Sequence, residues 1–163
     1  DQGGAFNNSH TALPMGSDLN GTYDIFCFTL FRDVNIEKNS IIESAKIKFI
    51  SAENSTGNTC NIRIYAENVD NANVITSKSD YTSRQRTTSY INWTIPDIND
   101  GDVIETPDIS EIISEIINRD GWNKGSIQLF FDPLDSCNII RGLQSFDNGN
   151  PPILYVNWKK IVL

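Results

Sequence analysis

The residues best suited to bind a ligand gather in a polar stretch at residues 67–88, where Tyr81 is followed closely by Arg84 and Arg86. An aromatic ring can stack on the apolar face of a sugar, and a guanidinium group binds a carboxylate through paired N–H donors. Arg141, in a later predicted strand, is a fourth candidate. We therefore expect Tyr81, Arg84, Arg86 and Arg141 to bind a carbohydrate, including an anionic sugar.

Other aromatic residues are weaker candidates for the same stacking role. Large aromatic side chains dominate the burial in protein cores, so we expect Trp93 and Trp122 to be core residues. The further stacking candidates are Tyr65, Tyr90, Tyr155 and Trp158.

Two acidic loops carry oxygen ligands of the kind that Ca²⁺ prefers. The candidate ligands are Glu67, Asp70 and Asn71 in one loop, and Asp97, Asn99, Asp100 and Asp102 in the other. Neither loop has the Asp-x-Asp-x-Asp-Gly spacing of a known calcium motif, since Gly101 comes one position early. The residues therefore predict either a structural calcium site or solvated turns.

Catalysis, nucleic-acid binding and membrane insertion are not expected. The single histidine, His10, lies in the irregular N-terminal arm with no Ser or Cys in a general-base arrangement, and most carboxylates lie in predicted turns. The 13 Lys and Arg residues are scattered among 21 Asp and Glu residues, which gives a net charge of −8 and no basic face for phosphates. No apolar stretch approaches the roughly 20 residues of a membrane span.

The three cysteines, Cys27, Cys60 and Cys137, lie far apart and lack the Cys-x-x-Cys spacing of a zinc or redox site. The simplest interpretation is that they are buried as small apolar residues. A Cys27–Cys60 disulfide and an intermolecular disulfide through Cys137 are the alternatives.

The elements that must position these residues are mostly strands. We predict an all-β, jelly-roll-like β-sandwich of about eight antiparallel strands, with residues 1–20 as an N-terminal arm or edge strand and 21–163 as one domain. Residues 23–31 are apolar on both faces and predict a central strand, and residues 41–50 and 60–65 alternate and predict a hairpin. Further strands are expected at 90–95, 126–131, 138–146 and 153–162.

One segment has helical spacing. Isoleucines recur at positions 109, 112, 113, 116 and 117, which predicts an amphipathic helix at about 108–119. Thr106 or Asp108 is expected to cap it, with Glu111 and Glu115 facing water. Residues 67–88 are expected to form one long loop.

The order of motifs is similar to that of a family of bacterial extracellular modules. The motifs include Asp33-Val34-Asn35-Ile36, Ile64-Tyr65-Ala66-Glu67-Asn68, Ser83-Arg84-Gln85-Arg86 and Pro152-Ile153-Leu154, and the resemblance spans about residues 17–160. The chain thus resembles jelly-roll carbohydrate-binding modules of the disaggregatase-related and DNRLRE-like type, although Glu37-Lys38-Asn39-Ser40 stands where they have a Pro-Gln-Gly turn. The resemblance implies a location outside the cell, at the cell surface or on a virion.

Two functions follow as hypotheses. The first is a non-catalytic extracellular module that binds a polysaccharide or a cell-surface glycan. The alternative is a structural subunit of a surface filament, appendage or virion that assembles with copies of itself, including by donation of its N-terminal strand to a neighbour.

Overall fold

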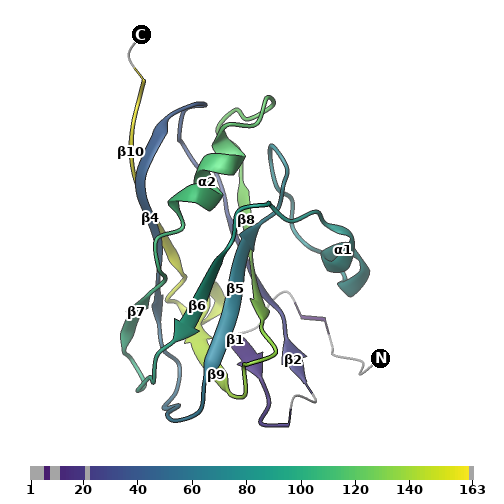
Figure 1. Ribbon diagram of the computed structural model, residues 1–163, viewed down its shortest axis with the longest axis vertical. Helices are drawn as coiled ribbons and strands as arrows, with labels where there is room; N and C mark the ends of the chain where they lie inside the picture. Colours follow the sequence, from purple (N-terminus) through teal and green to yellow (C-terminus); the bar gives the residue numbers. More distant parts are fainter. Residues whose placement is uncertain (1–5, 8–11, 21–22, 162–163) are drawn as a thin grey trace.

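Alternation of apolar and polar residues folds most of this chain into strands. Within residues 6–7, 12–20 and 23–161, which the computed structural model describes, ten strands form three antiparallel sheets (Figure 1). Along β5 (Cys60–Ala66) buried and half-buried residues alternate without exception, because successive side chains of a strand point to opposite faces. The predicted all-β sandwich is confirmed.

The first layer is a four-stranded sheet in the order β3-β8-β5-β6, which adds β3 (Cys27–Phe31), β8 (Ile127–Pro133) and β6 (Ile91–Ile95) to β5. The central position predicted for residues 23–31 is wrong, because they divide into β2 (Asp24–Ile25) and the edge strand β3. The outer face of β3 is apolar because the Tyr81 ring covers Phe28 there, and the centroids of the two rings are 5.8 Å apart.

The second layer combines two three-stranded sheets. One has the order β10-β4-β7, formed by Ile153–Lys159, Ile41–Ile50 and Val103–Glu105. The other has the order β2-β1-β9, in which β1 (Ala12–Ser17) lies between β2 and β9 (Ile140–Gln144). A bridge between Ser51 and Leu143 joins the two sheets. Residues 12–17, predicted as part of an arm or edge strand, are thus the middle strand of a sheet.

The predicted hairpin of residues 41–50 and 60–65 does not form. β4 pairs with β10 and β7, whereas β5 pairs with β6 and β8 in the opposite layer. The intervening loop begins with hydrogen bonds from Ser51 N to the Asp102 carbonyl and from Ala52 N to the Gly142 carbonyl. The chain therefore crosses the sandwich at a point where its composition predicted a turn.

Two α-helices in the described part of the chain complete the fold. α2 (Ser110–Ile117) confirms the predicted helix and closes one end of the sandwich with four buried isoleucines (Figure 1). Asp108 accepts hydrogen bonds from Ser110 N at 3.0 Å and Ala45 N at 2.9 Å, so it joins the start of the helix to β4. Glu115 does not simply face water, because it accepts hydrogen bonds from the amides of Thr88 and Ser89.

α1 (Lys78–Ser83) is a short helix within the stretch predicted to be one long loop. Its N-cap is Ser77, whose hydroxyl accepts a hydrogen bond from Asp80 N at 3.0 Å. A third, 3-10 helix, η1 (Phe146–Asn148), lies between β9 and β10.

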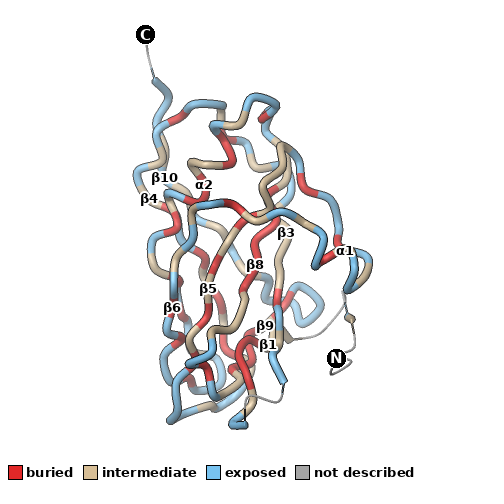
Figure 2. The backbone as a smooth tube through the Cα atoms, turned by 45° about the vertical axis from the view of Figure 1, so that its right-hand side comes forward, coloured by how far each residue is buried: buried red, intermediate tan, exposed pale blue. Residues whose placement is uncertain are grey.

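The core lies between the two layers (Figure 2). Phe49 of β4 meets Trp93 of β6 at a centroid distance of 6.0 Å and Phe131 of β8 at 5.8 Å. Trp93 and Trp122 are both buried, as predicted, and the Trp122 indole donates a hydrogen bond to the Ile36 carbonyl at 2.9 Å. A separate cluster of Ile75, Tyr81 and Phe130 lies under α1.

Candidate functional site

The predicted binding residues Tyr81, Arg84 and Arg86 do come together, at α1. Tyr81 is only 8% exposed, however, and its ring packs edge-on against Phe130 at 5.3 Å. Its hydroxyl donates to Asp132, whose pKa is raised because the carboxyl is buried. The exposed stacking ring predicted for Tyr81 is therefore wrong, because the residue attaches α1 to the sheet.

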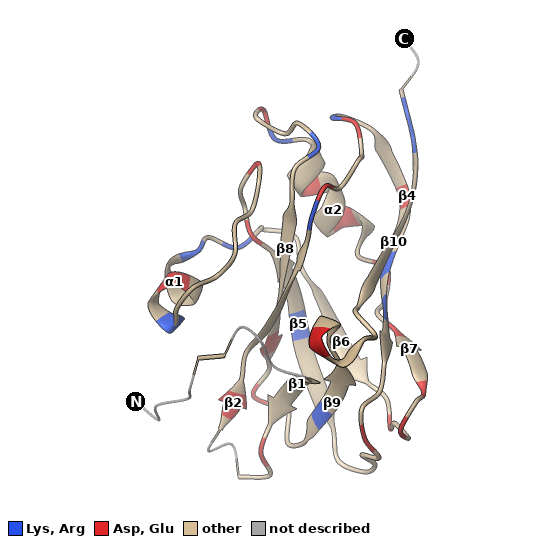
Figure 3. Cartoon of the chain, turned by 180° about the vertical axis from the view of Figure 1, so that it is seen from behind, with Lys and Arg blue, Asp and Glu red and all other residues tan. Residues whose placement is uncertain are grey.

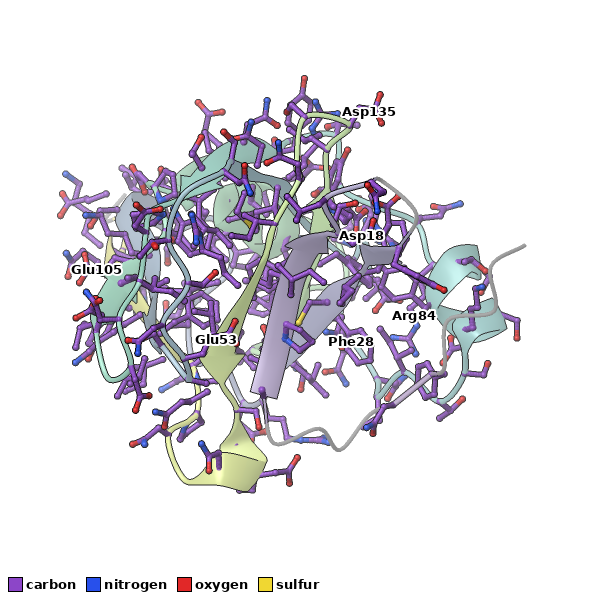
Figure 4. The ribbon with its side chains drawn as sticks, turned by 90° about the horizontal axis from the view of Figure 1, so that it is seen from below. Asp18, Phe28, Glu53, Arg84, Glu105 and Asp135 are labelled. Atoms are coloured by element: carbon purple, nitrogen blue, oxygen red, sulfur yellow. The ribbon has the colours of Figure 1, made fainter. Side chains whose placement is uncertain are left out.

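Arg84 holds the two ends of the α1 segment together. Its side chain is 10% exposed and donates to Glu67 at 2.8 Å and to Asp80 at 2.9 and 3.0 Å, as well as to the carbonyls of Asn73 and Val74. The bonds from Arg84, followed by one from the Thr76 amide, lower the pKa of Asp80 to about 2. Figure 4 shows Arg84 beside α1, across the molecule from Glu105 of β7.

The Arg86 guanidinium lies over the aromatic rings of Tyr81 and Phe130 in the cluster under α1. Its guanidinium carbon is 3.6 Å from the centre of the Phe130 ring and 4.6 Å from that of Tyr81. It donates to the carbonyls of Tyr81 and Arg84 at 3.1 and 2.9 Å. A cation placed between an aromatic cluster and two carbonyls stabilises the segment from within.

Arg141 lies at the other end of the sandwich, in β9, where Figure 3 shows a basic segment far from α1. Its side chain is 1% exposed. It donates to the carbonyls of Ile95, Ser55 and Gly57, and it pairs with Asp97 at 2.8 Å. The four residues predicted to bind one ligand therefore do not form one site.

The predicted calcium ligands have partners within the chain. Asp97 binds Arg141, and Asp102 accepts a hydrogen bond from Asn99 N at 2.7 Å. The backbone amide of Asp100 donates a hydrogen bond to the Asn54 side chain at 2.9 Å. In the described residues no three His, Cys, Asp or Glu side chains are placed to share a metal ion. Calcium binding here stays a prediction.

The other acidic loop, which contains Glu67, Asp70 and Asn71, lines an open polar pocket of about 400 Å³ together with Arg84. Glu67 pairs there with Arg84, whereas Asp70 pairs with Arg119 at 2.7 Å and Asn71 accepts a hydrogen bond from Ser126 N at 2.7 Å. The structure thus brings Glu67, Asn71 and Arg84 to one pocket, where Arg84 already donates to carboxylates and carbonyls of the chain.

The outer face of β5 and β6 presents an exposed site. Because Ile62, Ile64 and Trp93 point into the core, their neighbours along each strand point outward. Two outward pairs cross from β5 to β6, a third joins β5 to Tyr90 directly before β6, and we refer to these six residues as the cross-strand ladder. It consists of Asn61 with Thr94, Arg63 with Asn92, and Tyr65 with Tyr90.

Contacts between side chains hold the ladder in one arrangement. Thr94 donates to Asn61 at 2.7 Å, and the Arg63 Nε donates to Asn92 at 2.9 Å. The Tyr65 and Tyr90 rings lie 5.7 Å apart, and the Arg63 guanidinium sits 4.3 Å from the centre of the Tyr90 ring. Tyr90 remains 50% exposed. Two of the weaker aromatic candidates, Tyr65 and Tyr90, are therefore together at this face, where Tyr65 is partly buried because it also packs against the cluster of Ile75, Tyr81 and Phe130.

A second surface feature is an apolar groove of about 420 Å³ between the two layers. It is flanked by β3 and β10, which are both terminal strands of their sheets. Phe31, Val34, Leu154, Val156 and Trp158 line it and remain only partly buried. Tyr155 alternates with these residues along β10, so its side chain lies on the face opposite the groove, where it is 50% exposed.

Comparison with protein-family models finds no match, and comparison with curated proteins finds no similar sequence. The resemblance to extracellular carbohydrate-binding modules stays a prediction. No helix in the described part of the chain has both the length and the apolar character needed to cross a membrane. The residues of the chain itself are therefore the basis for assigning its function.

Proposed function

We propose that this chain is a non-catalytic, extracellular β-sandwich module that binds a polysaccharide or cell-surface glycan on the cross-strand ladder. The observation that carries the proposal is the joining of the exposed Tyr90 ring, the partly buried Tyr65 ring, a guanidinium group and two asparagine amides on the outer face of the sheet. The ladder takes the place of the loop arginines that the sequence predicted as the binding residues.

The chemistry of the ladder suits a sugar chain. A half-exposed Tyr90 ring offers an apolar surface for the C–H face of a sugar ring. The amides of Asn61 and Asn92 and the Thr94 hydroxyl offer both donors and acceptors, which is what a sugar hydroxyl requires. Arg63 adds a planar donor set that also suits the carboxylate of an acidic sugar.

The ladder is also rigid before a ligand arrives. Five of its side chains project from the paired strands β5 and β6, Tyr90 comes directly before β6, and four contacts across the pair fix them. Binding costs less free energy when side chains are already ordered. A ligand therefore gains from these contacts without first ordering a loop.

Replacing Tyr90 with alanine is expected to weaken glycan binding about tenfold or more, because the exposed stacking surface is lost. The measurement is a binding screen of soluble and insoluble polysaccharides, neutral and acidic, followed by calorimetry on any ligand found. Tyr155→Ala is the matched control, since Tyr155 is equally exposed on the opposite layer. An equal loss in both variants, or no glycan bound by the wild type, would contradict the proposal.

A second candidate function, assembly with copies of the same chain, is favoured by β10. Among the residues that the structure describes, this seven-residue strand is paired only with β4, and it carries apolar residues on both faces. An exposed apolar edge strand is a template for pairing with another chain. Donation of the N-terminal arm stays a prediction, since residues 1–5 and 8–11, including His10, lie outside the described residues.

If copies pair through β10, Tyr155→Lys is expected to prevent assembly, because a lysine on an edge strand opposes sheet extension. Light scattering coupled to size exclusion, over a wide concentration range, measures the mass of the wild type and the variant. Tyr90→Lys places the same charge on the other layer and should leave assembly intact. A wild type that is monomeric at every concentration removes this candidate.

A further inference from the structure

Two of the three cysteines meet inside the sandwich. Cys60 opens β5 and Cys137 lies in the turn before β9, and their sulfur atoms are 3.7 Å apart although 77 positions separate them in sequence. Both side chains are buried. The Cys27–Cys60 pair considered from the sequence is thus replaced by a contact that the sequence did not predict.

The backbone beside the two thiols holds them in register. Thr59 and Asn138, their immediate neighbours, are joined by a hydrogen bond from Asn138 N to the Thr59 carbonyl at 2.9 Å and by one from Thr59 N to the Asn138 side chain at 2.8 Å. On the other side, Leu134 N donates to the Asn61 carbonyl at 3.0 Å. The two segments are therefore fixed side by side on both flanks of the cysteines.

Gly16 of β1 leaves room for the sulfur atoms. A Cβ atom at this position would lie 3.1 Å from the Cys60 sulfur and 3.2 Å from the Cys137 sulfur. It would also clash with the Ile139 carbonyl, and the positive φ of 126° is one that other residues rarely adopt. A glycine in β1 thus covers the cysteine pair without separating it.

We propose that Cys60 and Cys137 form an intramolecular disulfide when the chain folds in an oxidising environment. The sulfur atoms must approach from 3.7 Å to about 2.05 Å, which small rotations of two side chains already in contact can supply. The oxidant is a disulfide, either of a small thiol such as glutathione or of an oxidoreductase. One cysteine attacks this disulfide, which releases a first thiol and leaves a mixed disulfide. The second cysteine then attacks the mixed disulfide and releases a second thiol. The two cysteines are thereby oxidised to one S–S bond, and the S–S bond of the oxidant is reduced to two thiols.

The bond is expected to close during folding rather than after it. Burial raises the pKa of the Cys60 thiol, with a further contribution from Cys137, so the reactive thiolate is scarce once the sandwich is complete. The same burial then protects the disulfide from external thiols. Oxidation therefore has to precede the arrival of β1 over the pair.

Cys27 is left as the third, unpaired cysteine. It lies in β3 opposite Phe131 and is buried, which raises its pKa to about 12. A thiol in this state is a poor nucleophile, so the odd number of cysteines requires no bond to another molecule.

The test is to refold the reduced, unfolded chain in a glutathione redox buffer, then unfold it in denaturant that contains an alkylating reagent, so that the buried Cys27 thiol can react, and measure the intact mass. We expect one alkylated cysteine instead of three, and proteolytic peptides that join Cys60 to Cys137. The melting temperature of the oxidised protein should exceed that of the reduced protein by about 5–15 °C.

Variants separate this disulfide from general effects of oxidation. For each variant, the melting temperature of the oxidised protein is compared with that of the reduced protein. The difference should vanish in Cys137→Ala, which cannot form the disulfide, and persist in Cys27→Ala. Three alkylated cysteines in the wild type, or a disulfide that includes Cys27, would overturn the proposal. The peptide map of the wild type decides the matter even where a variant fails to fold.

Discussion

Replacing Arg141 with alanine is expected to lower the free energy of unfolding by about 3–5 kcal/mol. The guanidinium group is almost completely buried and supplies donors to three backbone carbonyls and to Asp97. Removing it leaves those carbonyls without a partner and creates a cavity between the layers. Asp97 loses less, because its side chain is 60% exposed and regains water.

Urea denaturation followed by fluorescence measures this effect. Arg63→Ala is the matched control, since Arg63 lies on the outer face of β5 and its loss is expected to cost less than about 1 kcal/mol. Arg141→Lys should recover only part of the stability, because an ammonium group cannot reach carbonyls on several sides as the planar guanidinium does. Equal stability of Arg141→Ala and Arg63→Ala would contradict a structural role for Arg141.

Replacing Phe49 with alanine is the second large effect, again about 3–5 kcal/mol of lost stability. Phe49 is 1% exposed and its ring contacts Trp93 and Phe131, so it links β4 to β6 and β8 across the core. The variant leaves a cavity where both layers lose their main aromatic contact.

The same denaturation experiment tests this prediction, with Phe146→Ala as the control. Phe146 is 79% exposed in η1, so its removal should change stability by less than about 0.5 kcal/mol. A loss at Phe49 no larger than that at Phe146 would show that the two layers are not held together through this ring.

Most of the longer strands and α2 could be predicted because their patterns are local, whereas the three residues of β7 (Val103–Glu105) are too few for a pattern. The isoleucine stripe predicted a helix at about 108–119, and α2 spans Ser110–Ile117. The hairpin of β4 and β5 was wrong because turn-forming residues show where a chain bends but not which layer it enters. The helix α1 escaped prediction because its six residues are polar apart from Tyr81, so no apolar stripe is present.

The functional residues were harder to predict, because arginines and tyrosines serve both surfaces and interiors. Arg84 and Arg141 were expected to meet a ligand, yet backbone carbonyls surround them, from the same loop for Arg84 and from distant segments for Arg141. Such acceptors leave no signal in the sequence. Tyr65 and Tyr90 could be named as aromatic candidates. Their pairing became visible only once the register of β5 and β6 placed both on the outward face.

The pairing of early strands with late ones has a consequence for how the chain reaches this structure. β1 pairs with β9, and β4 pairs with β10, so both sheets of the second layer join segments that are made at very different times. Proteins dominated by such distant pairings fold slowly, because long loops must close before the contacts form. During synthesis β4 is therefore complete before its partner β10 has been made. Until then, the edge of β4 that β10 will cover is open to pairing with any other extended segment.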